Sequence, residues 1–151
     1  MSQKNRVIQL VKQQIAAEGE NVKHITELRK KVGIAAARLI LLELRLESEK
    51  HVAILTEMLE FLEGAHEDTL LWEHELEEYI DETLVREEFE DHVKKESGAL
   101  KQLQEELRHT KDEALKLLLN NMEEDEKRHH GMAQILVRNL YKIDERGRPL
   151  K

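Results

Sequence analysis

Apolar residues recur every three or four positions through nearly all of this 151-residue chain, and its single proline is Pro149. This spacing matches the 3.6-residue period of the α-helix, in which residues i, i+3, i+4 and i+7 share one face. Proline would break such helices, and none occurs before position 149. Aromatic residues make up only 3% of the chain, so the aromatic and β-branched runs typical of strands are missing. The sequence therefore predicts an all-α fold.

The apolar pattern predicts four long helices, which suit a four-helix bundle formed by a single domain. Short connections join the first helix to the second and the third to the fourth, so each pair is expected to form an antiparallel hairpin. A longer acidic connector between the hairpins gives a bundle with one crossover. We expect Gly33 to cap the end of the first helix, and Thr110 with Glu113 to form a capping box at the start of the fourth. The domain covers residues 1–151, with helices at 4–32, 35–62, 84–109 and 111–141 and the connector at 65–83.

The two expected hairpins resemble each other in sequence. An offset of 78 residues pairs Leu41 with Leu119 and His51 with His129. This similarity predicts two related hairpins that pack about a pseudo-twofold axis, an arrangement that places equivalent residues opposite one another.

Composition excludes several classes of protein. The chain has no cysteine, which rules out disulfides, thiolate zinc sites, iron–sulfur clusters and a rubredoxin-type module. Its net charge of −8 argues against nucleic acid as a partner, because phosphate binding requires a basic face. No apolar run is long enough to span a bilayer, and the first residues lack the apolar core of a signal peptide. We expect no membrane partner and a cytoplasmic location.

Acidic and histidine side chains fall inside the apolar stripe of every predicted helix when successive residues are placed about 100° apart. A buried carboxylate without a partner is costly, so several carboxylates that converge in one small core require compensating cations. A bound metal supplies that charge, and carboxylates with imidazoles suit iron, manganese or zinc. These polar residues are Glu18 on the first helix, Glu47 and His51 on the second, Glu96 on the third, and Asp125, Glu126 and His129 on the fourth.

This set of residues resembles the metal site of the ferritin-like, rubrerythrin-like di-iron carboxylate proteins. In those bundles, two helices each supply a glutamate and the other two each supply a Glu-x-x-His motif. Glu96 and the motif Glu126–His129 fit this pattern, and Glu18 and His51 occupy the equivalent positions 78 residues earlier. The resemblance implies a non-haem di-iron site with two irons per chain, which would oxidise Fe2+ or reduce O2 or peroxide as a ferroxidase or peroxidase does. The metal ligands that we expect are Glu18, Glu47, His51, Glu96, Glu126 and His129, with His92 and Asp125 as residues that orient them.

Ser48 departs from the family pattern, because it stands where the motif of the second helix would have its bridging glutamate. Glu47 is the obvious substitute, although it meets His51 at a different spacing. Three outcomes stay open: a site rebuilt around Glu47, an asymmetric site with one strongly bound metal, or a relic that no longer binds metal tightly. The alternative functions are a structural or interaction bundle with a degenerate site, and a zinc or manganese binder without redox activity. We expect a homodimer rather than a cage.

Overall fold

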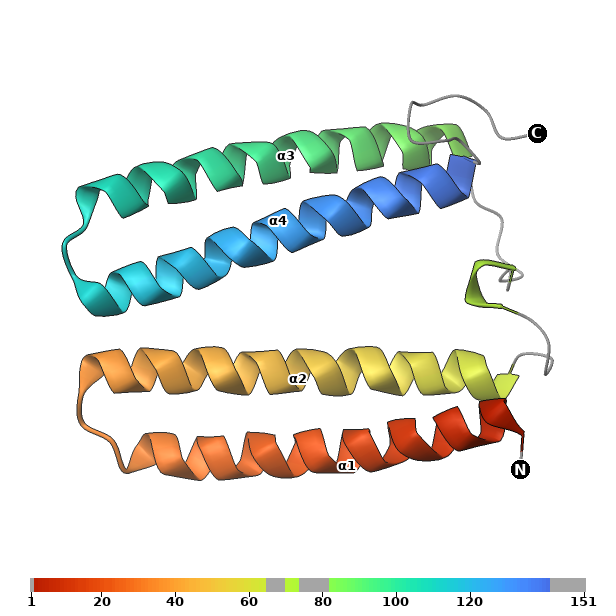
Figure 1. Cartoon of the computed structure of the whole chain (residues 1–151), viewed down its shortest axis with the longest axis horizontal. Helices are drawn as coiled ribbons and strands as arrows, with labels where there is room; N and C mark the ends of the chain where they lie inside the picture. Colours follow the sequence, from red (N-terminus) through yellow and green to blue (C-terminus); the bar gives the residue numbers. More distant parts are fainter. Residues whose placement is uncertain (1, 65–69, 74–81, 142–151) are drawn as a thin grey trace. The chain divides into compact units, whose positions relative to one another are not determined.

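The computed structural model describes residues 2–64, 70–73 and 82–141; the regular secondary structure of these residues is helical, and they contain no strand (Figure 1). This confirms the predicted all-α class and the four long helices. The predicted connector lies for the most part outside the described residues. The helices are α1 (Gln3–Lys30), α2 (Ala35–Gly64), the short 3-10 helix η1 (Leu71–Glu73), α3 (Glu82–His109) and α4 (Glu113–Tyr141).

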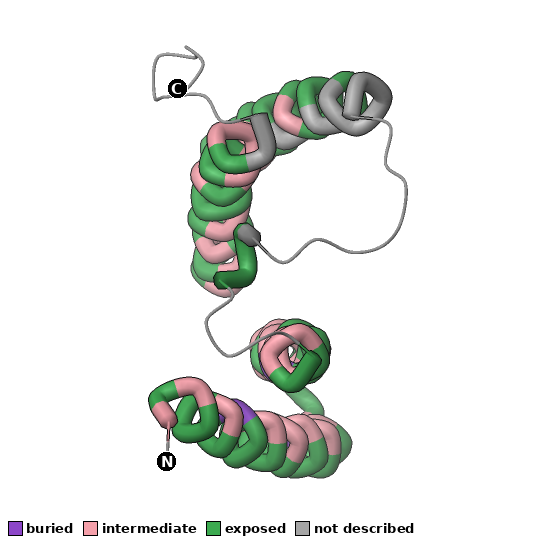
Figure 2. Tube along the Cα trace, turned by 90° about the vertical axis from the view of Figure 1, so that its right-hand side faces the viewer, coloured by how far each residue is buried: buried purple, intermediate pink, exposed green. Residues whose placement is uncertain are grey.

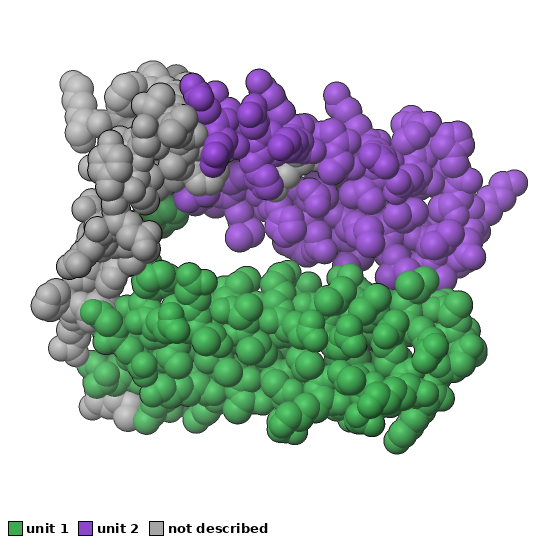
Figure 3. All heavy atoms as spheres, turned by 180° about the vertical axis from the view of Figure 1, so that it is seen from behind, with its two compact units in different colours: residues 1–75 green, residues 76–151 purple. Residues whose placement is uncertain are grey.

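The chain divides into two compact units, residues 1–75 and residues 76–151, which Figure 3 shows in separate colours. In the first unit, α1 and α2 lie side by side and the chain reverses between them (Figure 1). The least exposed apolar side chains of this hairpin are Val11 and Ile25 on α1 and Leu55 on α2. At its open end, the Nζ atom of Lys12 lies 2.8 Å from a carboxylate oxygen of Glu63. Apolar packing along the helices thus holds the hairpin together, and the exposed ion pair at its open end adds little to its stability.

In the second unit, α3 and α4 also lie side by side, and a turn at residues 110–112 joins them. Figure 2 shows that the described residues of both helices are either of intermediate burial or exposed. This shallow burial is expected of two helices, because a pair of helices encloses much less volume than a bundle. The larger half-buried apolar residues whose side chains are described are Val93, Leu100, Leu103 and Leu107 on α3, and Leu118, Leu119, Leu136 and Val137 on α4.

Two helix ends differ from the prediction. Helix α1 ends before Gly33: Lys31 is its C-cap, and the Lys31 backbone N–H donates to the carbonyl of Leu28 at 3.0 Å in a tightened last turn. Helix α4 is capped by Asp112, whose carboxylate accepts backbone hydrogen bonds from Ala114 at 2.9 Å and Leu115 at 3.1 Å. The predicted capping box of Thr110 with Glu113 is therefore wrong. The carboxylate of Asp112 stands next to the first turn, whereas the Thr110 hydroxyl accepts from the Asp112 N–H at 3.3 Å.

The two hairpins have the same layout. Helix α2 begins at residue 35 and α4 at residue 113, which is 78 residues later. Exposure repeats with the same offset: Leu39 and Leu117 are both exposed, and so are Ile54 and Met132. The similarity that the sequence shows between the hairpins is therefore present in their helix boundaries and in their surfaces. Within the described residues, no helix is both long enough and apolar enough to cross a membrane.

Replacing Asp112 with Ala should lower the free energy of unfolding of the full chain by about 1 kcal/mol, because two backbone N–H groups of α4 lose their acceptor. Urea denaturation followed by circular dichroism measures this loss. Asp112→Asn should change stability much less, and Thr110→Ala is the matched control. A larger loss for Thr110→Ala than for Asp112→Ala would contradict this assignment of the cap.

Candidate metal site

The first hairpin brings three of the predicted ligands together. The Nδ1 atom of His51 lies 3.2 Å from a carboxylate oxygen of Glu18, across the interface between α1 and α2. The Nε2 atom of the same ring lies 3.3 Å from a carboxylate oxygen of Glu47, one helical turn earlier on α2. The side chain of Glu18 is 19% exposed, whereas those of Glu47 and His51 are 36% and 41% exposed. Each ring nitrogen of His51 thus faces a different carboxylate.

Helix spacing explains why Glu18 is the most enclosed of the three. Val11, Glu18 and Ile25 follow one another at seven-residue intervals, which is close to two helical turns, so they form one line along α1. Val11 and Ile25 are buried at 6% and 8% exposure. A glutamate between two buried apolar residues must lie against the partner helix, and His51 supplies its polar contact there.

Two parallel lines of residues on α2 have different surroundings. We call the first the packed stripe; it includes the two buried residues of α2, Ser48 at 6% and Leu55 at 9% exposure. We call the second the open stripe; it includes Leu44 and Ile54, which are 50% and 51% exposed. The residues of the packed stripe are Leu41, Ser48, Leu55 and Leu62, and those of the open stripe are Leu44, Glu47, His51 and Ile54.

Ser48 belongs to the packed stripe, and this bears on its departure from the family motif. At 6% exposure, it is the one buried polar residue in the part of the chain that the structure describes. A glutamate at this position would bring a charged and much larger side chain into closely packed surroundings, at a considerable desolvation cost. Glu47, one position earlier, lies on the open stripe, and it is Glu47 that meets His51.

A lysine that the helical wheel did not single out also contacts this cluster. The Nζ atom of Lys50 lies 2.7 Å from the same carboxylate oxygen of Glu47 that faces His51. The equivalent pair in the second hairpin, Asp125 and Arg128, is also in contact. The i,i+3 spacing of acid and base is the sequence signal that could have revealed both pairs. Lys50 neutralises part of the Glu47 charge, so the contact with His51 does not depend on a bound cation.

The second hairpin places its predicted residues less closely. Glu126 is half-buried on α4, whereas His129 and His92 are exposed. Asp125 has a side-chain exposure of 20% and pairs with Arg128. Glu96 lies within α3, but its side chain is outside the described residues. The neighbouring His130 is half-buried, and its ring lies 3.2 Å from the amide of Gln134.

The donor atoms around His51 fit a metal in part. Two ligands on an ion with bonds of about 2.1 Å lie roughly 3 to 3.5 Å apart, and the Glu47 carboxylate lies 3.3 Å from Nε2. Glu18, however, faces the opposite nitrogen of the ring, so the three groups do not converge on one point. Accordingly, no cluster of three or more acidic or histidine side chains in the described residues is arranged to hold a metal. A metal bound by the Glu47 carboxylate and the His51 imidazole would need further ligands from other residues.

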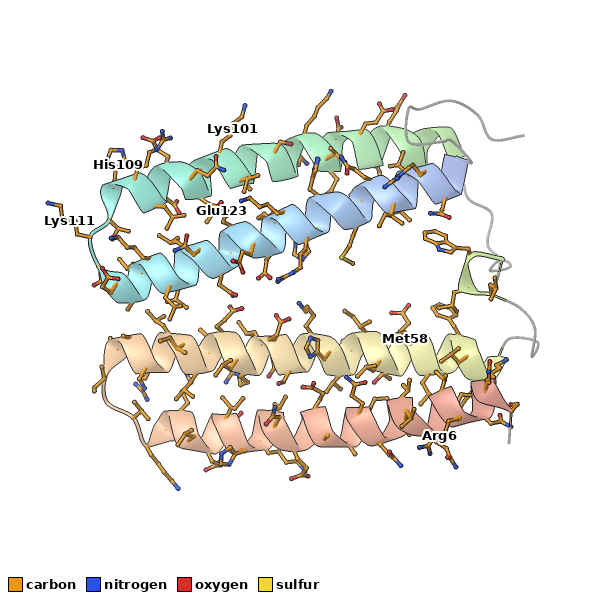
Figure 4. All side chains as sticks on the ribbon, viewed as in Figure 1. Arg6, Met58, Lys101, His109, Lys111 and Glu123 are labelled. Carbon is orange, nitrogen blue, oxygen red and sulfur yellow. The ribbon has the colours of Figure 1, made fainter. Side chains whose placement is uncertain are left out.

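An exposed pair on α3 provides a comparison. The Nε2 atom of His109 lies 2.8 Å from Glu105, at the same i,i+4 spacing as Glu47 and His51, and Arg108 also contacts this carboxylate (His109 is labelled in Figure 4). The hydrogen bond with His109 and the charge of Arg108 lower the pKa of Glu105. All three belong to one turn-and-a-half of a single helix at the surface. An acid–histidine pair alone therefore does not identify a site, and His51 differs from His109 in that it also contacts a second helix.

The interaction between Glu18 and His51 should be measurable without any metal. A double-mutant cycle with Glu18→Gln and His51→Gln should give a coupling free energy of about 1 kcal/mol, because the pair links two helices and is partly shielded from water. The same cycle with Glu105→Gln and His109→Gln should give a much smaller coupling, because both side chains of that pair are exposed to water on one helix. Urea denaturation of the wild type and these variants provides the values. Equal coupling in the two cycles would contradict the link between α1 and α2.

Comparison with known proteins finds no matching family model, no matching curated protein and no matching solved structure. The expected resemblance to the ferritin-like proteins therefore rests on this chain's own residues alone. These are the motif Glu126–His129 with Glu96 in the second hairpin, and Glu18 with His51 in the first. Of these residues, Glu18 and His51 are the two whose side chains are in contact in the structure.

Proposed function

We propose that this protein binds a redox-active metal, iron in the first place, through carboxylate and histidine side chains in the interior of a ferritin-like four-helix bundle. The observation that carries the proposal is the meeting of Glu18, Glu47 and His51, with both ring nitrogens of His51 within 3.3 Å of a carboxylate. These residues come from two helices and lie 33 positions apart along the chain at their widest. Nitrogen and oxygen donors of this kind suit iron, manganese and zinc.

Large apolar side chains lie beside the cluster and are exposed. Leu44 and Ile54, which flank Glu47 and His51 on the open stripe, are 50% and 51% exposed. The equivalents on α4 are Met122 and Met132, exposed by 44% and 65%. Apolar surface is stabilised by removal from water, which favours a bundle in which such side chains are covered. In the four-helix bundle that we propose, the antiparallel hairpins are joined by one crossover, and Glu96, Glu126 and His129 are further ligands, as the family resemblance implies.

The residues of the chain would have distinct tasks in such a site. The metal would be held by the six predicted ligands, Glu18, Glu47, His51, Glu96, Glu126 and His129, and apolar side chains around them would exclude water from it. Iron, when bound, supplies one-electron exchange, so a pair of ions matches the two electrons that the reduction of peroxide to water requires. O2 or peroxide would be the oxidant, and the chain itself holds no cysteine-bound iron centre to deliver electrons. A homodimer is the assembly that we propose.

Metal content tests this function. After anaerobic loading with Fe2+ and thorough desalting, elemental analysis should find about two irons per chain if Glu47 substitutes for the missing bridging glutamate, and about one if the second hairpin alone binds. Glu47→Gln and His51→Ala should lower the iron content in the first case. Glu105→Gln and His109→Ala, which alter an equally spaced but exposed pair, should leave it unchanged. Iron-free wild-type protein would contradict the iron proposal, and loading with zinc and with manganese would then test a binder without redox activity.

A second function, a structural or interaction bundle with a degenerate site, is favoured by one observation. Ser48 fills a closely packed position, where the family motif has a metal-bridging glutamate. In such a protein His51 and its carboxylates would be the remnant of a lost metal site. Replacing polar side chains at a helix interface with apolar residues of similar size can raise stability.

Thermal unfolding with and without metal distinguishes the two functions. For a metal-binding protein, metal at about 100 times its Kd should add roughly 2.7 kcal/mol to the free energy of unfolding of the wild type, and much less to His51→Leu. For a degenerate site, added metal should stabilise neither protein, and His51→Leu should be at least as stable as the wild type. Asp112→Asn, which is remote from the cluster in sequence, provides the control for changes unrelated to metal.

A further inference from the structure

The two carboxylates beside His51 differ in their surroundings, and this difference suggests different roles. Glu18 reaches the ring from the other helix, is 19% exposed, and lies in line between the buried residues Val11 and Ile25. Glu47 is 36% exposed, lies on the same helix as His51, and shares its carboxylate oxygen with Lys50 at 2.7 Å. Glu18 is therefore confined by packing, whereas Glu47 lies on the accessible side of the ring.

Imidazole chemistry limits what the two ring nitrogens can do together. A neutral histidine that binds a metal offers the lone pair of one nitrogen and carries a proton on the other. That N–H group is almost always donated to a carboxylate, a carbonyl or a water, which fixes the tautomer and the orientation of the ring. At His51, the contact of Nδ1 with Glu18 at 3.2 Å has the geometry of a hydrogen bond.

We propose that Glu18 is a positioning residue: it accepts a hydrogen bond from Nδ1–H of His51 and leaves Nε2, on the side of Glu47, as the nitrogen that binds metal. This inference rests on the proposed metal-binding function, and it changes one part of it. The family resemblance makes Glu18 a direct ligand, whereas the geometry makes Glu18 the group that holds the ligand in place. Glu47 and His51 are then the ligands that the first hairpin supplies.

The tautomer of His51 tests this role in the full-length, metal-free protein. Long-range 1H–15N spectra of histidine side chains at pH 8 distinguish a proton on Nδ1 from one on Nε2. The wild type should carry its proton on Nδ1. Glu18→Leu, which suits the apolar line of α1 but cannot accept a hydrogen bond, should lose this preference, and Glu18→Gln, which keeps an acceptor and the size of the side chain, should retain more of it. Glu20→Leu, on the exposed side of α1, is the matched control and should leave the spectrum of His51 unchanged.

Metal titration of the same variants separates a positioning residue from a ligand. With Zn2+ or Mn2+ as the probe, Glu18→Leu should weaken binding by about 10- to 100-fold, the usual loss for an orienting partner. Glu47→Gln should weaken binding more than Glu18→Leu and leave the His51 tautomer as it is.

Two results would overturn the assignment: a wild-type His51 with its proton on Nε2, or a Glu18→Leu variant that binds no metal while its tautomer is unchanged. A third result is possible: the wild type binds neither metal, its His51 carries the proton on Nδ1, and Glu18→Leu abolishes that preference. The proposed function then fails, while the hydrogen-bonding role of Glu18 stands. The two failures are therefore distinguishable.

Discussion

The seven-residue spacing along α1 and α2 determines where Glu18, Ser48 and His51 of the first hairpin lie. Seven residues are close to two turns of helix, so residues at this interval form lines, and neighbouring lines on one helix face different surroundings. On α1, one line holds Val11, Glu18 and Ile25. On α2, the packed stripe meets α1, and the open stripe, with Glu47 and His51, lies beside it. A side chain at position 48 therefore lies in the packed interface with α1, whereas a side chain at position 47 lies on the accessible side of α2.

This arrangement accounts for the unusual content of the interface. Ser48 is small enough for a closely packed position, where it is 6% exposed. Glu18 is held between apolar residues, and a buried carboxylate requires a partner. His51 supplies that partner from the edge of the open stripe, and Lys50 compensates the neighbouring Glu47. The polar residues of the hairpin are thus mutually satisfied to a large extent, which allows them to persist before any metal binds.

The sequence was sufficient to predict the features that depend on periodicity. The all-α class, the four helices and the placement of Glu47 one turn before His51 all result from 3.6 residues per turn. Features that depend on side-chain competition were not predictable in this way. Asp112 rather than Thr110 caps α4, because both can serve as caps and only the course of the backbone decides between them. The wheel also placed His129 in the core, whereas its side chain is exposed on α4.

The position of Glu18 shows both the strength and the limit of reasoning from the sequence. Its place on the apolar stripe of α1 could be read from the helical wheel, and so could its approach to α2. Which nitrogen of His51 it would face could not, because that depends on the rotamers of two side chains on different helices. The distinction matters chemically, since a carboxylate at one nitrogen orients the ring while a carboxylate at the other can share a metal with it.

The most direct test of the central claim is to add substoichiometric Mn2+ to the full-length protein and monitor the loss of backbone amide signals in 1H–15N spectra. A metal held by the proposed ligands should broaden first the signals near Glu47 and His51 on α2 and those near Glu126 and His129 on α4. The signals near Glu105 and His109 should persist. Early broadening at the exposed pair on α3, or weak broadening spread over all the acidic residues, would contradict a metal site in the interior of this protein.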